Sequence, residues 1–160
     1  MAHNSWTSLN AFSRLVRHEH QDPTPLKLLE MLLPAHSEAT LHQEGYVEIV
    51  SQGRTLATWI DEFGGTIRFR AVLVPWTDFS ILSNENGEKL AAHLNATFQF
   101  GRFNSNNPIG LLLDYELPFV EGLVLGVISS AVNKLATTAK TARENHIETV
   151  LARARARRRA

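Results

Sequence analysis

From residue 66 onward the chain alternates between polar and apolar side chains. Thr66, Arg68 and Arg70 fall on one side of an extended backbone, and Ile67, Phe69, Ala71 and Leu73 fall on the other. A period of two is the pattern of a β-strand that is buried on one face and open to solvent on the other, and such half-buried strands belong to antiparallel sheets. The segment 66–74 is therefore the central expectation for the fold.

Further strand-like segments flank it on both sides. Turns at 51–54 and at Gly64-Gly65 are short and contain glycine, which predicts hairpins. A later turn rich in Asn, Ser and Pro separates two more strands, and Pro118 ends the last one. The five expected strands lie within residues 40–50, 55–60, 66–74, 98–103 and 109–117.

Two short helices are predicted outside the strands. One is capped by Thr24 and carries Pro25 at its first helical position, where a missing N–H costs nothing. We expect its apolar stripe at Leu26, Leu29, Leu32 and Leu33, and its end at Pro34. The other covers 84–97, with Leu90, Ala91 and Leu94 facing inward. In addition to these two, the spacing of apolar residues within 1–22 suits a short amphipathic helix.

The last element is a long helix over about 122–155, without an internal proline. It would be about 50 Å long, whereas a body of this size is roughly 35 Å across, so one end should overhang. The apolar stripe thins to alanine after Leu135, which predicts weak packing of the distal part. The fold class is thus α+β, in the order α-βββ-α-ββ-α, with residues 1–23 as an N-terminal extension, 24–140 as the domain and 141–160 as distal helix and basic tail.

Composition excludes several classes of protein. The 160 residues include no cysteine, which excludes disulfide frameworks, thiolate catalysis and cysteine-based metal sites. No run of about 18 apolar residues is present, so no membrane span is expected, and the start lacks the pattern of a secretory signal. We therefore expect a cytoplasmic protein. The net charge is zero, but five of the 16 basic residues lie in the last eight positions, and residues 1–150 carry about −5.

Catalytic motifs are absent from the sequence. There is no phosphate-binding glycine loop, no G-x-S-x-G and no H-E-x-x-H. Asp114 and Glu116 share the polar face of a strand, where they would serve acid–base chemistry or simply form a solvated face. His18 and His20 have the wrong spacing for a helical metal pair, while His36 and His42 flank a loop. We expect no catalytic, metal-binding or cofactor-binding residues.

Two features suit contacts with other macromolecules. Trp76 follows Pro75 at the start of a segment, 75–87, that is expected to be a loop or a broken helix, and its side chain is either core or a protein contact. The arginines at 153, 155 and 157–159 would contact phosphates or acidic surfaces, or would favour the dipole of the helix end.

Four segments together resemble the YbjN-like family, which is similar in fold to the type III secretion chaperones. They are Ile67-Arg68-Phe69-Arg70-Ala71, Leu94-Asn95, Phe100-Gly101-Arg102-Phe103, and the run from Leu111 to Pro118 with its Asp-Tyr-Glu-Leu-Pro ending. The resemblance covers roughly residues 24–140; the first 23 residues and the basic tail depart from it. It implies a five-stranded antiparallel sheet with helices on one side, paired into a homodimer that binds extended stretches of another protein.

The function expected from these observations is a non-enzymatic, chaperone-like or regulatory protein-binding module. It would act as a homodimer on an unidentified protein client, by groove packing or edge-strand addition. The expected dimer or client contacts are Trp76, Ile109, Leu111, Leu113 and Tyr115. The alternatives are a nucleic-acid-associated protein that uses the arginine-rich tail, and an enzyme that uses the carboxylates and histidines.

Overall fold

The computed structural model describes residues 24–36, 38–61, 65–106, 108–118 and 124–159. The helices are α2 (Pro25–Leu32), α3 (Trp76–Phe79), α4 (Asn84–Thr97), α5 (Leu125–Ala142) and α6 (Glu148–Arg159), with a π-helical turn, η1 (Arg143–Ile147), between the last two. The strands are β1 (Ala39–Leu41), β2 (Val47–Ser51), β3 (Arg54–Asp61), β4 (Thr66–Pro75), β5 (Arg102–Asn106) and β6 (Gly110–Pro118). The expected α+β class is confirmed. The predicted helix within residues 1–22 lies outside the described residues.

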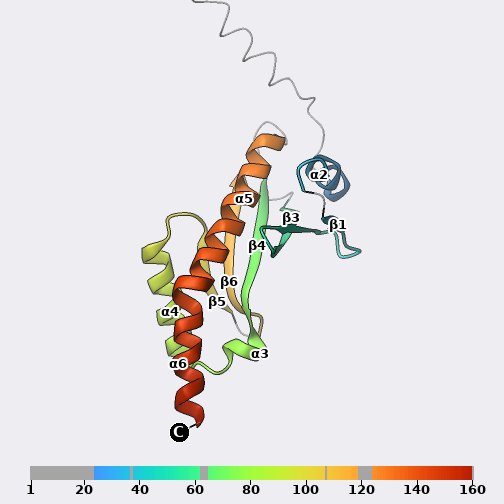
Figure 1. Cartoon of the computed structure of the whole chain (residues 1–160). Coiled ribbons are helices and arrows are strands. Elements are labelled where there is room, and N and C mark those ends of the chain that lie inside the picture. Colours follow the sequence, from blue (N-terminus) through green and yellow to red (C-terminus); the bar gives the residue numbers. More distant parts are fainter. Residues whose placement is uncertain (1–23, 37, 62–64, 107, 119–123, 160) are drawn as a thin grey trace, which may run out of the picture.

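The six strands form one antiparallel sheet in the order β1-β2-β3-β4-β6-β5. The long helix of α5, η1 and α6 runs along the sheet, as Figure 1 shows, and α5 contacts β2, β3, β4 and β6. The side chains of β4 that alternate inward, Ile67, Phe69, Ala71 and Leu73, are all buried. The alternation that predicted this strand therefore separates the core face of the sheet from its open face.

The sheet has six strands where five were expected, because residues 40–50 form two strands. Gly45 adopts a positive φ of 83°, and the N–H of His42 donates a hydrogen bond of 2.9 Å to the carbonyl oxygen of Tyr46. This turn splits the segment into β1 and β2. The next turn has positive φ at both Gln52 and Gly53, which is the type I′ geometry that suits a two-residue hairpin.

Strand β5 begins four residues later than predicted, at Arg102 in place of residue 98. The chain bends at Gly101, whose φ is +80°. A Cβ at this position would lie 2.7 Å from Cδ1 of Leu113, so only glycine fits. Phe98 and Phe100 therefore precede the strand and pack partly buried against the core.

Helix α2 begins as predicted. The side chain of Thr24 accepts a hydrogen bond from the N–H of Lys27, and Pro25 occupies the first turn. Its buried face differs from the prediction, because Leu28 and Leu32 are fully buried while Leu26 and Leu33 are 56% and 45% exposed. The helix carries apolar residues at almost every position, so the sequence left its rotation open. Helix α4 and its inward Leu90, Ala91 and Leu94 are confirmed.

The weak packing predicted for the distal helix is wrong as far as Leu151. Ala136, Ala139, Ala142 and Ile147 are fully buried, and Leu151 is 1% exposed. Small alanine side chains let a helix approach its neighbours closely. The stretch after Leu135, where alanine replaces larger apolar residues, is therefore a region of close packing. No described residue beyond Leu151 is buried, and the C-terminal end of α6 extends past α3 and α4 in Figure 1.

The π-helical turn η1 explains how one helix keeps a single face on the core. Ala142 and Ile147 are both buried but five residues apart, a spacing that an α-helix would place on different sides. A π-turn accommodates the additional residue. It also positions Arg143, whose Nη1 donates a hydrogen bond of 2.9 Å to the carbonyl oxygen of Leu73. Leu73 lies beyond Ala71, the last residue of β4 that pairs with β3.

Candidate binding surfaces

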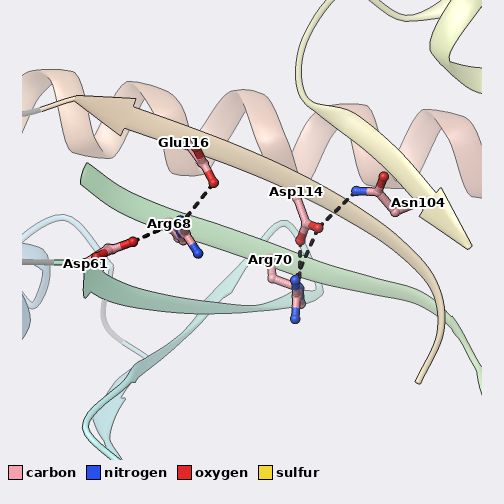
Figure 2. A network of polar contacts seen from close by, with 6 residues as sticks. All are labelled: Asp61, Arg68, Arg70, Asn104, Asp114 and Glu116. Atoms are coloured by element: carbon pink, nitrogen blue, oxygen red, sulfur yellow. Dashed lines mark hydrogen bonds and ion pairs between the residues drawn. The ribbon is translucent and has the colours of Figure 1, made fainter. Parts of the chain in front are cut away.

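The open face of the sheet carries a network of ion pairs between β3, β4 and β6, drawn in Figure 2. Arg68 bridges two strands, with Nη2 lying 2.8 Å from Asp61 and Nε lying 3.1 Å from Glu116. Arg68 and Glu116 occupy facing positions on β4 and β6. Because cross-strand pairs are the unit of sheet stabilisation, this contact helps to set the register of the two strands.

A second unit centres on Asp114. Arg70 donates to both of its oxygens, from Nε at 2.7 Å and from Nη2 at 3.2 Å, and Nδ2 of Asn104 donates to Oδ2 at 3.1 Å. The guanidinium of Arg70 also lies 5.3 Å from the ring centre of Trp59. A bidentate arginine–carboxylate pair is stronger than a single contact, although both side chains keep about a quarter to a third of their surface exposed.

These contacts account for the two carboxylates considered for acid–base chemistry. Asp114 and Glu116 share the open face, as predicted. Asp114 accepts two hydrogen bonds from Arg70, and Glu116 forms an ion pair with Arg68; both arginines lie on β4. Both arginines and both carboxylates come from segments that carried the family resemblance, and Phe69 faces Tyr115 between them. The two segments are thus complementary partners across one strand pair.

The outer edge of β5 is closed by a side chain. Oδ1 of Asn95 accepts a 2.7 Å hydrogen bond from the N–H of Phe103, and its Nδ2 donates 2.8 Å to the carbonyl oxygen of the same residue. In an antiparallel sheet, the N–H and C=O of a residue point together either toward one neighbouring strand or away from it. At an edge strand, groups that point away from the paired strand are open to an added strand. Asn95 therefore occupies the place that an added strand would take beside Phe103, the second residue of β5.

A groove with a volume of about 440 Å³ lies between α4 and α6. We call it the α4–α6 groove. Apolar and basic residues line it from both helices and from the turn before α4. Its residues are Ile81, Leu82, Asn86, Lys89, Leu90, His93, Val150, Arg153, Ala154, Arg157 and Arg158.

Two histidines meet near one end of this groove. Nε2 of His93 on α4 lies 3.3 Å from Nδ1 of His146 in η1, and the ring of His146 packs edge-on against Phe98. Across the described ranges no three His, Cys, Asp or Glu side chains converge on a common point. The pair is a contact between two helical segments that the sequence spacing did not suggest.

The loop histidines are placed separately. His42 stacks on Tyr46 with ring centres 4.4 Å apart and lies 3.7 Å from Glu48. His36 is buried, and burial lowers the pKa of its imidazole. His18 and His20 lie outside the described residues.

The five predicted contact residues fall in different environments. Leu111 and Leu113 are fully buried in the core of the chain, so their side chains are not at the surface. Tyr115 is partly buried and stacks on Phe100 with ring centres 4.3 Å apart. Ile109 is 40% exposed, and its carbonyl oxygen accepts a hydrogen bond from the N–H of the partly buried Trp76. The structure thus brings Ile109 and Trp76 together at one end of β6.

The groove itself was missed by sequence reasoning, although a signal for it exists. Val150, Arg153, Ala154 and Arg157 recur at positions i, i+3, i+4 and i+7, the spacing of one helix face. The arginines were interpreted together as a tail, which concealed their alternation with apolar residues on the side that faces α4.

Comparison with known proteins identifies the fold. The chain matches a chain in the crystal structure of the ExsC–ExsE complex with a TM-score of 0.58 and 14% sequence identity, over 76% of this chain and 94% of that one. It matches YbjN, a candidate transcription regulator from E. coli, with a TM-score of 0.57 and 12% identity, over 82% and 97% of the two chains. The expected YbjN-like, secretion-chaperone-like fold is confirmed.

The sequence matches none of the protein-family models and none of the curated proteins with which it was compared. None of the helices in the described part of the chain has both the length and the apolar character needed to cross a membrane.

Proposed function

We propose that this chain is a non-enzymatic, cytoplasmic protein-binding module of chaperone-like or regulatory type that acts as a homodimer. The observation that carries the proposal is the structural match to a chain of a two-protein complex, ExsC–ExsE, which covers 94% of that chain. The match concerns the fold, and fold alone does not fix function. The surfaces of this chain add the physical support.

The polar groups on the open sheet face support a structural role over catalysis. Asp114 is bound by Arg70 and Asn104, and Glu116 is bound by Arg68. A general acid or base needs a free position from which to reach a substrate proton. Carboxylates held in this way instead stabilise the pairing of β4 with β6.

The closed edge of β5 favours groove packing over strand addition as the binding mode. Asn95 forms hydrogen bonds with both outward-facing backbone groups of Phe103. The opposite edge of the sheet is β1, which is only three residues long. Strand addition needs a run of free N–H and C=O groups. A client segment therefore finds more contact on side-chain surfaces than on a sheet edge.

The proposed dimer contact lies on α2 and the start of α5, two helices that touch each other. Exposed apolar side chains lie on these helices or at their ends: Leu26 is 56%, Leu33 45%, Val124 46% and Val127 48% exposed. Exposed apolar side chains on adjoining elements mark interaction surfaces. This position replaces the buried Leu111 and Leu113 as the proposed self-contact.

Light scattering after size exclusion tests the dimer, with the variant Val127→Asp. We expect a dimer for the unaltered chain and a monomer for the variant. Val72→Asp is the matched control, because Val72 is equally exposed, at 48%, on a different element. A strict monomer at micromolar concentration counts against the homodimer. Affinity capture from native lysate, followed by reconstitution of the captured pair from purified proteins, tests the client-binding role; failure to reconstitute any complex rejects it.

A second candidate is association with nucleic acid through the arginine-rich end. The observation that favours it is the cluster of five arginines within the last eight residues. Arg155 forms a 3.9 Å ion pair with Asp78, and Arg158 donates a hydrogen bond of 3.1 Å to the carbonyl oxygen of Ser80. Two of the five arginines therefore contact other parts of the domain. Deletion of residues 153–160 should then abolish a strongly salt-dependent binding to duplex DNA or RNA.

A further inference from the structure

We infer that the α4–α6 groove binds an acidic amphipathic segment of a partner protein. The apolar side chains of the segment would lie on the groove floor, and its carboxylates would pair with the cationic rim. This inference rests on the proposed protein-binding function, and it adds the surface that is used and the chemistry of the partner.

The floor of the groove is apolar and belongs to packed elements. Leu82 and Leu90 are 9% and 5% exposed, so they are fixed by the core beneath them. Val150 and Ala154 are partly buried on the facing side of α6 and lie one helical turn apart. Two helices with apolar residues between them form the kind of groove that accepts the apolar face of a third helix.

The rim carries basic side chains that are in part uncompensated. Arg153 and Arg157 line the groove one turn apart, and among the described residues neither forms an ion pair. The favourable effect of cations on a helix dipole is confined to the last turn, so it does not account for Arg153. A guanidinium binds a carboxylate in bidentate geometry, which makes an acidic partner the natural complement.

Charge and polarity together select the occupant. The chain's own first 23 residues carry Arg14 and Arg17 against Glu19 and Asp22, so that segment offers no net negative charge to the rim. A phosphate backbone would suit the arginines but would leave the apolar floor uncovered. An acidic peptide with apolar residues at i, i+4 and i+7 satisfies both parts of the groove.

The test uses a fluorescent 16-residue peptide with leucine at those spacings and glutamate at most other positions, titrated with the full chain by anisotropy. A peptide of the same composition in scrambled order is the sequence control. We expect the patterned peptide to bind at least about tenfold more tightly than the scrambled one, because only the patterned one covers the floor. Raising the salt concentration should weaken the interaction.

The double variant Arg153→Glu/Arg157→Glu reverses the rim, and Arg155→Glu/Arg159→Glu is its matched control, with the same change of charge on the same helix but outside the groove lining. We expect the first to weaken binding by about tenfold or more, and the second by less than about threefold. Ala154→Phe fills the floor without changing charge and should also weaken binding.

Three outcomes of the peptide titration would overturn the inference: no binding of the patterned peptide at low salt, equal binding of the scrambled peptide, or an equal loss in both arginine variants. A duplex DNA or RNA that binds in preference to the peptide would assign the arginines to nucleic acid. Assembly of further copies that is lost in the groove variant would make a second copy the occupant. If a captured client binds the Arg153→Glu/Arg157→Glu variant undiminished, the groove inference fails while the proposed function stands.

Discussion

The side-chain amide of Asn95 bonds to both backbone groups of Phe103, at 2.7 Å to the N–H and 2.8 Å to the carbonyl oxygen. A single residue on α4 thus acts as a one-residue strand against the edge of β5. It satisfies polar groups beside a side chain that is only 1% exposed. Exposed sheet edges are sites of unwanted pairing between chains, and here the edge is already occupied at Phe103.

Replacing Asn95 with alanine should lower the free energy of unfolding by about 1–3 kcal/mol, because two hydrogen bonds are lost together. Urea denaturation measures the change. Asn86→Ala on the same helix is the control, since the Asn86 side chain makes no hydrogen bond with the described residues. It measures the gain in helix propensity that any Asn→Ala exchange brings on this helix. The opened edge should also increase self-association in light scattering. Equal stability of the two variants would contradict a structural role for the amide.

The Arg70–Asp114 pair should show a larger coupling than an ordinary surface pair. In a double-mutant cycle with Arg70→Ala and Asp114→Ala, we expect about 1 kcal/mol, because the contact is bidentate but partly open to solvent. The pair Glu85–Lys89 on α4 is the reference, since both its side chains are largely exposed, and about 0.3–0.5 kcal/mol is expected there. Couplings of the same size would show that the network on the sheet adds nothing beyond surface attraction.

Gly110 and Gly126 should respond in opposite ways to alanine. At Gly110 the φ is +126° and an added Cβ would lie 2.0 Å from the carbonyl oxygen of Val74, so we expect a loss of about 3 kcal/mol or more. At Gly126, in the first turn of α5, nothing lies within 4 Å of the added Cβ, and a gain of up to about 1 kcal/mol is expected. Thermal unfolding of both variants measures the difference. A neutral Gly110→Ala would mean that β4 and β6 are further apart than described.

Stability should depend on pH through His36. Burial lowers its pKa below the ordinary 6.5, so near that pH the unfolded chain binds a proton that the folded chain does not. The free energy of unfolding therefore falls as pH drops from 6.5 toward the lowered pKa, and it is fully restored above 6.5. Urea titrations of the unaltered chain and of His36→Gln between about pH 8 and pH 5 measure this, and the variant should lose less stability. Parallel curves would exclude His36 as the cause.

The parts of the fold that were predicted correctly have strong periodic patterns. The alternation around Phe69 located β4, and the cap at Thr24 located the start of α2. The errors concentrate where one glycine redirects the backbone, at Gly45 and Gly101. A glycine inside a strand-like run is consistent with either a weak strand position or a turn, and only contacts with distant residues decide between them.

The binding surfaces were less accessible to sequence reasoning. The pairing of Arg70 with Asp114 joins residues 44 positions apart, and the contact of Asn95 with Phe103 depends on the bend at Gly101 between them. Leu111 and Leu113 on β6 were predicted to contact a partner because the apolar face of that strand is long. In the structure both are buried in the chain's own core, where α5 contacts β6. A long apolar face records that something packs on it, but not which molecule does so.

The wide turn between Ala142 and Ile147 couples the arginine-bearing end of the final helix to the interior of the domain. If the same residues closed into a regular α-helical turn, everything beyond them would rotate by roughly 100° about the helix axis. Leu151 would then leave the core, and Arg153 and Arg157 would turn away from α4. The direction in which these charges point is thus set by the same packing that holds the helix on the sheet.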